Sequence, residues 1–251
     1  MKIAVCIKRV PDTETRIKIG ADGRSIDEDG VKFVLNPYDE YALEAALQLK
    51  ETEPDGSDVV AIALGSDASQ ETIRTALAMG ADRGILLQTD EVSVDPVASA
   101  KVLVAELAAG GYDVMLFGKL AIDDYHQAVG TIVAELLGVA SVSGISHLSI
   151  AGGKGVAHRE IEGGVEVVKF ALPVVLTADK GLNEPRYPAL RGIMMAKKKP
   201  LEVKPVTLAQ GAVAIKELVL PPPRAEGRIV GEGPDAVPAL IEALRVEAKV
   251  L

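Results

Sequence analysis

Short apolar runs alternate along this chain with longer segments that carry helical signals, and this alternation is the feature that most constrains its fold. The runs lie at residues 3–8, 58–64, 84–87 and 114–117. Continuous apolar runs of this kind are typical of strands buried on both faces of a parallel sheet. Helices between them predict right-handed βαβ units, and therefore an α/β fold with a doubly wound, mostly parallel sheet. Such sheets bind ligands at the carboxyl ends of their strands.

The expected helices have recognisable ends. Asn36 suits an N-cap and Pro37 the first helical position, so a helix is predicted to begin there. Residues 66–69 are expected to supply caps for a second helix that ends at Gly80. A third helix is predicted to open at 95–96 and close at 110–111, and a fourth to span 128–137.

Other segments indicate antiparallel structure and an appendage. Residues 16–19 and 31–35 predict a small hairpin after the first strand, and 154–161 with 165–172 predict a second one. Residues 173–177 return to buried apolar character. From about Asp179 the chain becomes basic and then rich in proline and glycine, with a last helix expected over 236–248. We therefore expect a nucleotide-binding domain over 1–180 and an interaction arm over 181–251.

Composition excludes several classes of protein. The net charge of -9, from 27 Lys and Arg against 36 Asp and Glu, argues against a binder of nucleic acid backbones, and aromatic residues for base stacking make up only 3%. The single Cys6 lies in an apolar run, which predicts a buried small side chain rather than a reactive thiol. The start of the sequence resembles a first strand and no window is apolar enough to span a membrane, so a cytoplasmic protein without membrane insertion is expected.

Catalytic motifs for nucleotide hydrolysis, esterase chemistry or zinc proteolysis are missing from the sequence. The histidines, His126, His147 and His158, lack metal-ligand spacing, so no metal site and no catalytic residue are predicted. The segment 118–130 follows a strand and precedes a helix, where consecutive backbone N–H groups can bind a phosphate. The alternative is that Asp123 or Asp124 only caps that helix.

Four segments carry a resemblance to a known family. They are residues 34–40 (VLNPYDE), 70–84 (QETIRTALAMGADRG), 118–130 (GKLAIDDYHQAVG) and 178–199 (ADKGLNEPRYPALRGIMMAKKK). In this order and spacing they resemble the β subunit of electron transfer flavoproteins, over residues 2 to about 206. The resemblance implies a Rossmann-like sheet of the kind found in adenine nucleotide hydrolases, with the antiparallel hairpin and a C-terminal arm.

The resemblance also implies a function without substrate chemistry of its own. Members of the family are electron carriers, in which an α and a β subunit form a heterodimer. One FAD is held mainly by the α subunit, and the β subunit binds a structural AMP and helps to enclose the flavin. Electrons pass from flavin dehydrogenases, notably the acyl-CoA dehydrogenases of fatty acid oxidation, to a membrane quinone oxidoreductase.

Carried over to this sequence, the resemblance places the AMP site on residues at strand ends and helix starts. They are Cys6, Asn36, Pro37, Tyr38, Asp39, Leu64, Gly118, Lys119, Leu120, Ala121, Ile122, Asp123, Asp124, Tyr125, His126, Gln127, Ala128 and Val129. The amides of residues 124–129 are expected to face the phosphate, whereas Asp123 is expected to order the loop. Tyr38 is expected either to approach the flavin edge or to pack at the helix start.

The phosphate loop departs from the mammalian pattern of the family. Ala128 and Val129 replace polar side chains, so backbone donors remain while side-chain support is lost. Some relatives bind a second FAD here and bifurcate electrons. This chain shares with them the terminal Val129 and Gly130 but has Asp124-Tyr125-His126 in place of their Gly-Asp-Thr, so AMP is expected. A second hypothesis is a stand-alone adenine-nucleotide-binding module of the universal-stress type, which would not need the arm after Asp179.

The basic segment is expected to be a recognition loop for dehydrogenases, with Leu190 as the anchor that enters a partner pocket. The alternative is a solvated helix end. The expected partner-binding residues are Arg186, Tyr187, Leu190, Arg191, Ile193, Met194, Lys197 and Lys198. The arm through Leu251 is expected to wrap the α subunit.

Overall fold

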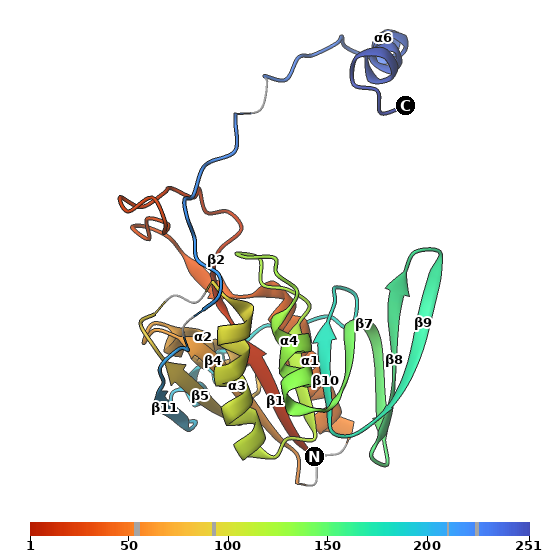
Figure 1. Ribbon diagram of the computed structural model, residues 1–251. Helices are drawn as coiled ribbons and strands as arrows, with labels where there is room; N and C mark the ends of the chain where they lie inside the picture. The colour runs from red at the N-terminus through yellow and green to blue at the C-terminus, as the bar shows by residue number, and fades with distance from the viewer. Residues whose placement is uncertain (53–55, 92–93, 210, 224–225) are drawn as a thin grey trace. The chain divides into compact units, whose positions relative to one another are not determined.

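A large sheet organises the part of the chain that the computed structural model describes, residues 1–52, 56–91, 94–209, 211–223 and 226–251. Within these residues nine strands form one sheet in the order β11-β5-β4-β1-β6-β10-β7-β8-β9 (Figure 1). The strands from β11 to β7 run parallel, and β8 and β9 add to the end as an antiparallel pair. The predicted α/β class and mostly parallel sheet are confirmed.

Bounds of the elements follow the sequence signals closely. The strands are β1 Lys2–Ile7, β2 Arg9–Pro11, β3 Phe33–Leu35, β4 Asp58–Gly65, β5 Arg83–Gln88, β6 Val114–Gly118, β7 Ala140–Ala151, β8 Lys154–Ile161, β9 Gly164–Ala171, β10 Val174–Ala178 and β11 Leu201–Pro205. The helices between them are α1 Pro37–Thr52, α2 Ser69–Met79, α3 Pro96–Gly110, α4 Val129–Leu137 and α5 Leu190–Ala196.

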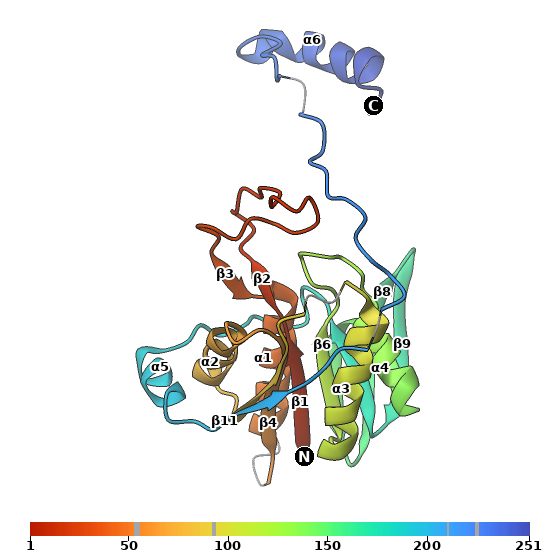
Figure 2. The same cartoon turned by 60° about the vertical axis from the view of Figure 1, so that its left-hand side comes forward.

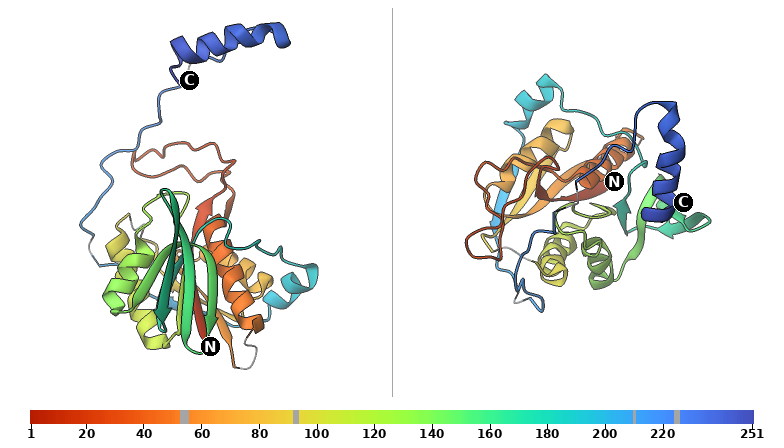
Figure 3. Two further views of the ribbon diagram at one scale, coloured as in Figure 1. Left: turned by 90° about the vertical axis from the view of Figure 1, so that its right-hand side faces the viewer. Right: turned by 90° about the horizontal axis from the view of Figure 1, so that it is seen from above.

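Helices cover both faces of the sheet, as the continuous apolar runs predict. Along β1, Ile3 and Val5 belong to the same buried cluster as side chains of α1 and α2. Ala4 and Cys6 belong to a second cluster with side chains of α3 and α4. Figure 2 shows the two helix layers on opposite sides of the strands, and the left view of Figure 3 shows the same layering from the hairpin end. Both faces of the central strands β5, β4, β1, β6 and β10 are therefore largely buried, which explains why polar alternation is missing from them.

The starts of α3 and α2 differ in side-chain capping, although the sequence predicts a cap for both. The side chain of Asp95 accepts a hydrogen bond from Val97 N at 2.8 Å and caps α3 as predicted, and Gly111 ends the helix in the left-handed conformation. The capping expected from residues 66–69 is wrong for α2. Its N-cap is Ala68, and no described side chain caps it, because Asp67 instead accepts from the side chain of Gln70 at 2.6 Å.

The hairpin after β1 exists with different strands from those predicted. Antiparallel pairing joins β2 to β3, and residues 16–26 contribute a single bridge between Ile19 and Ile26. The expected strand over 16–19 is therefore wrong. Its residues lie in the long loop between β2 and β3, and among them only Ile19 takes part in a β-bridge. The second hairpin, β8 with β9, is confirmed.

Residues after 178 belong partly to the sheet unit. β11 pairs in parallel with β5 and forms the edge of the large sheet. A Cβ on Gly192 would lie 2.4 Å from the carbonyl oxygen of Ala78, so the backbone of α5 rests directly on α2. One compact unit extends over Met1–Glu217 and a second over Leu218–Leu251, so the sheet unit continues well past the boundary expected at residue 180.

The second unit contains the helix expected over 236–248. It consists of the short helix η1 Pro234–Ala236, α6 Val237–Glu242 and the π-type turn η2 Ala243–Glu247. Arg228 donates to Glu247 at 2.5 Å within this unit. Across the described residues, helices that combine the length and the apolar character needed to span a membrane are absent.

Candidate functional site

Polar groups converge where the strand order of the sheet changes direction. The chain passes from β1 to β4 and β5 on one side and returns to β6 and β10 on the other, so the change lies between β1 and β6. Asp39 in the first turn of α1 joins the two strand ends. Its carboxylate accepts from Lys8 N at 2.7 Å and from Gly118 N at 3.0 Å. This is the position at which doubly wound sheets bind ligands.

Asp39 is a buried carboxyl group, 5% exposed. Burial raises its pKa to about 7, although hydrogen bonds from Asn36, Lys8 and Gly118 lower it. Burial, with the charge of Asp39 second, also raises the pKa of the Cys6 thiol far above its ordinary value. The expectation that Cys6 is an inert buried side chain is therefore supported, since a protonated thiol is a poor nucleophile.

Asn36 attaches the loop after β6 to the start of α1. Its side-chain amide donates to the carbonyl of Leu120 at 2.8 Å and accepts from the backbone of Ile122 at 3.2 Å. Asn36 is fully buried, so these bonds also satisfy its polar atoms. The side-chain amide that makes Asn36 a good N-cap residue thus also contacts a loop more than 80 residues away in the chain.

Lys8 holds the next part of the same loop. Its ammonium lies 2.8 Å from a carboxylate oxygen of Asp123 and 2.8 Å from one of Asp124. Burial by itself lowers the pKa of Lys8, but the charges and hydrogen bonds of the two aspartates outweigh it and raise that pKa. For Asp124, burial raises the pKa while bonds from His126 N and Lys8 lower it, with a net lowering. Lys8 and Asp124 are therefore both charged near neutral pH.

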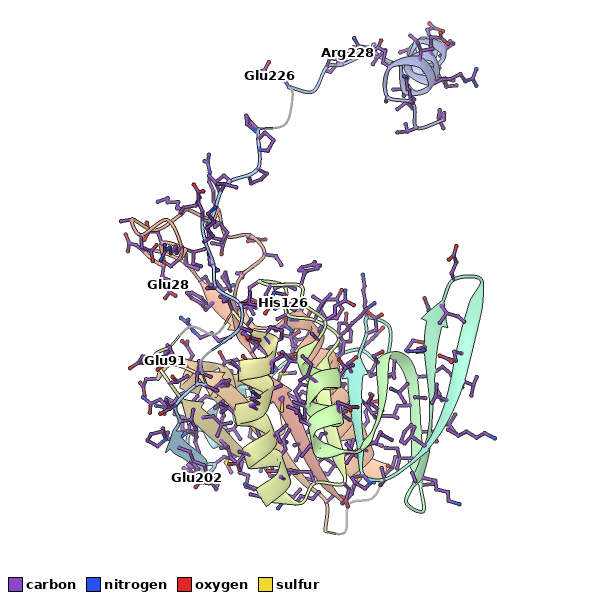
Figure 4. All side chains as sticks on the ribbon, in the orientation of Figure 1. Glu28, Glu91, His126, Glu202, Glu226 and Arg228 are labelled. Carbon is purple, nitrogen blue, oxygen red and sulfur yellow. The ribbon has the colours of Figure 1, made fainter. Side chains whose placement is uncertain are left out.

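In the remainder of the loop, several backbone amides donate hydrogen bonds to acceptors in the loop itself. Tyr125 N donates to Ala121 O at 2.9 Å, and His126 N donates to Asp124 Oδ1 at 3.0 Å. Tyr125 and Gln127 adopt φ values of 55° and 53°, which are unfavourable for residues other than glycine. His126 projects from this loop at the end of the unit where α4 begins (Figure 4). Of the amides expected to face a phosphate, those of Tyr125 and His126 thus have partners inside the loop, as does that of Asp124.

The start of α4 is open. Its N-cap is Ala128, and among the described residues no side chain caps it. The amides of Gln127, Ala128 and Val129 likewise have no hydrogen-bond acceptor within the described chain. The alternative that Asp123 or Asp124 caps this helix is wrong, because both carboxylates turn to Lys8. Unpaired donors at a helix start suit the oxygens of a phosphate group.

Close packing fixes the floor of this site. A Cβ on Gly118 would lie 2.4 Å from Asp39 Oδ1 and 2.8 Å from the carbonyl carbon of Tyr38. Lys119 donates to Asp179 at 2.7 Å, which attaches the loop to the end of β10. A side chain larger than hydrogen at Gly118 would therefore separate α1 from the end of β6.

A second surface lies on the segment 182–199. Several of its apolar side chains are exposed: Tyr187 is 95% exposed and Leu190 77% exposed, and Ile193 and Met194 are also exposed. Arg191, Lys197 and Lys198 are exposed cations, and none has an ion-pair partner in the described chain. Arg186 differs from these residues. Its guanidinium binds the carboxylates of Glu44 and Glu51 in α1.

Comparison with known proteins shows the family to which the chain belongs. A model described as "Electron transfer flavoprotein domain" matches residues 24–209. This chain belongs to the electron transfer flavoprotein family. A protein of Syntrophomonas wolfei named electron transfer flavoprotein subunit beta is 43% identical over 235 residues, which cover 94% of this chain and 92% of that protein. Proteins of the same name from Bacillus subtilis and Homo sapiens are 39% and 38% identical, and each comparison covers at least 98% of both chains.

The structure brings most of the residues expected for the nucleotide site of this electron transfer flavoprotein subunit to one end of the sheet. Asn36, Asp39 and residues 118–129 meet there, with Pro37 and Tyr38 half-buried at the start of α1. Cys6 and Leu64 lie one residue before the ends of β1 and β4, at the same end of the sheet, and face α3 and α4, where Cys6 is buried and Leu64 packs against the core. Lys8 also belongs to this site, although the sequence placed it only at the end of the first strand. Its role depends on an ion pair across more than 110 residues, which no local pattern reveals.

One pair of histidines was also missed. His147 and His158 are partners across the β7–β8 ladder, and their ring centroids lie 4.7 Å apart. Spacing along the chain could not show this, because the pairing depends on the register of the hairpin. Clusters of three or more potential metal ligands are absent from the described residues.

Proposed function

We propose that this chain is the β subunit of a heterodimeric electron transfer flavoprotein, working in the cytoplasm. It accepts electrons from flavin dehydrogenases such as acyl-CoA dehydrogenases, and the heterodimer passes them to a quinone oxidoreductase. The family assignment supports the role of an electron carrier, and the names of the relatives describe them as subunits. The stand-alone universal-stress type of module is disfavoured for the same reason.

The observation that carries the nucleotide-binding part is the open start of α4 at the change in strand order. Three backbone amides there have no acceptor among the described residues, and the ammonium of Lys8 pairs with both neighbouring aspartates. The donor set thus fits a phosphate, and the proposed ligand is AMP. Gln127, Ala128 and Val129 would hold its phosphate through their backbone, while Asn36 and Asp39 keep the loop in place.

The redox group in this proposal is FAD, held mainly by the α subunit and enclosed in part by this chain. FAD supplies the electron-carrying chemistry when bound. This chain contributes the shape of the site and the position of the α subunit, to which residues 218–251 are proposed to bind. Exposed apolar side chains support that contact, since Val219, Leu220 and Ile229 are all exposed in the second unit.

The outward face of the segment 182–199 is the proposed docking site for dehydrogenases. Leu190 and Met194 of α5 are exposed, and the exposed cations Arg191, Lys197 and Lys198 belong to the same segment. Exposed apolar and basic side chains in one segment fit a partner that has an apolar pocket and carboxylates beside it.

Nucleotide extraction from the intact heterodimer tests this proposal. The two subunits are co-expressed and purified together, the complex is denatured, and the released nucleotides are identified by mass and quantified against protein. We expect one FAD and one AMP per heterodimer. Two FAD and no AMP would replace the AMP proposal with the electron-bifurcating alternative, and a colourless homodimer of this chain would overturn the whole assignment.

A further inference from the structure

The cations of the segment 182–199 form two groups: some are exposed to solvent, and the others contact the neighbouring helices. Arg191, Lys197 and Lys198 are exposed, and none of them has an ion-pair partner in the described chain. Arg186 and Lys199 instead bind groups of α1 and α2. A uniformly basic stretch of sequence therefore contains both outward-facing and inward-facing side chains.

The inward group at the start of the segment is centred on a buried carboxylate. Glu44 lies in the middle of α1 and is 4% exposed. The guanidinium of Arg186 donates to both of its oxygens, at 2.7 and 2.9 Å, and a third nitrogen donates to Glu51 at 2.7 Å. The backbone amide of Arg186 also donates to Glu44, at 3.3 Å. A buried carboxylate needs such partners, because an unpaired buried charge is strongly unfavourable.

The inward group at the end of the segment is a reciprocal pair of helix caps. Arg74 of α2 donates to the carbonyls of Ala196 and Lys199 at 2.6 and 2.8 Å, at the end of α5. Lys199 in turn donates to the carbonyls of Leu77 and Ala81 at 2.9 and 2.6 Å, at the end of α2. Each cation thus satisfies carbonyl groups at the end of the other helix, where cations also complement the helix dipole.

We propose that Arg186 is a positioning residue that, with the Arg74–Lys199 pair at the other end, holds the segment 182–199 rigid so that Leu190 and its neighbours are presented in a docking-ready arrangement. This inference rests on the docking role proposed above. It replaces the expectation that Arg186 contacts the partner, since all the donors that it uses face α1. A segment ordered before binding loses less conformational freedom on docking, and this strengthens binding without any additional contact.

Two measurements on the heterodimer test this proposal. Hydrogen exchange of the amides in 182–199, recorded without any partner, reports the order of the segment. Steady-state reduction by an acyl-CoA dehydrogenase, as a function of heterodimer concentration, gives the half-saturating concentration and the limiting rate. Arg191→Gln is the matched control for Arg186→Gln, because it removes the same charge from an outward-facing side chain of the same segment.

For Arg186→Gln we expect faster exchange across the segment and a half-saturating concentration raised by about two- to tenfold, with the limiting rate unchanged. For Arg191→Gln we expect exchange as in the parent. Arg186→Lys should recover only part of the protection, because lysine cannot form the bidentate contact. If Arg186→Gln prevents assembly, Arg186→Lys makes the comparison, because it keeps the charge beside Glu44 and loses the bidentate contact.

Parental exchange in Arg186→Gln, or in Arg186→Lys where that variant replaces it, would overturn the positioning role. Faster exchange together with parental half-saturating concentrations in the Arg186, Arg191 and Leu190 variants would support the positioning role and overturn the docking role. The failure of this inference and the failure of the proposed function are therefore distinguishable.

Discussion

Asp39 gives this protein a dependence of stability on pH that its surface carboxylates cannot produce. Burial raises its pKa from 3.8 to about 7, so the protonated form is favoured in the folded chain. Since the folded pKa lies above the unfolded one, this contribution to stability is fully present below pH 3.8 and is lost as pH rises through about 7. The perturbation that isolates it is Asp39→Asn, which keeps the shape and removes the titration.

The size of the effect follows from the two pKa values. With 3.8 in the unfolded chain and about 7 in the folded chain, raising the pH from 5 to 8 lowers the free energy of unfolding by roughly 2–3 kcal/mol. The asparagine variant loses this slope. It also presents an N–H group to one of the two backbone donors, Lys8 N or Gly118 N, so we expect a pH-independent loss of about 1–3 kcal/mol.

Urea unfolding of the full chain at a series of pH values between 5 and 8 measures both the pH-dependent change in the free energy of unfolding and the pH-independent loss. Asp12→Asn is the control, because the bond from Lys32 and that from Glu14 N lower the pKa of Asp12, and its titration is complete below this range. We expect the slope of the control to equal that of the parent. An Asp39→Asn variant with the parental slope would refute the assignment of the pH dependence to this carboxyl group.

Three further substitutions test the site and the docking surface. Gly118→Ala should destabilise the chain by about 1–3 kcal/mol and reduce bound AMP, because its Cβ would lie 2.4 Å from Asp39; thermal unfolding and nucleotide content check this. Lys8→Met should reduce AMP content while the flavin content stays constant, because Asp123 and Asp124 would then repel a phosphate; AMP content equal to the parent would contradict it. Leu190→Ala should slow reduction by a partner dehydrogenase with unchanged flavin content, measured by stopped-flow absorbance; equal rates would remove its role as an anchor.

Local patterns were sufficient for most elements of the sheet unit. The apolar runs became strands buried on both faces, and Pro37, Asp95 and Gly111 mark the helix ends that their chemistry predicts. Local rules failed where a polar residue had a stronger tertiary alternative. The side chain of Asn36 binds the loop after β6 as well as Asp39 of its own helix, and Asp123 pairs with Lys8 instead of capping α4.

The appendage shows the same limit on a larger scale. Its basic, proline-rich sequence predicts an arm from about residue 180, yet β11 completes the edge of the sheet and α5 rests on α2. A single edge strand has little local signal of its own, because its pairing with β5 supplies its order. Only the part after Glu217 forms a separate unit.

By itself, the sequence determined the class of fold and the order of its elements and indicated the loop that we propose to bind a phosphate, because these depend on periodicity and on residues that are close in the chain. Tertiary structure alone decided which charges are available to a ligand or partner. Lys8 pairs with the two aspartates of the loop and Arg186 pairs with Glu44, while Arg191 stays exposed. Ion pairs between distant segments require the folded chain to bring them together, so composition counts these charges but cannot assign their partners.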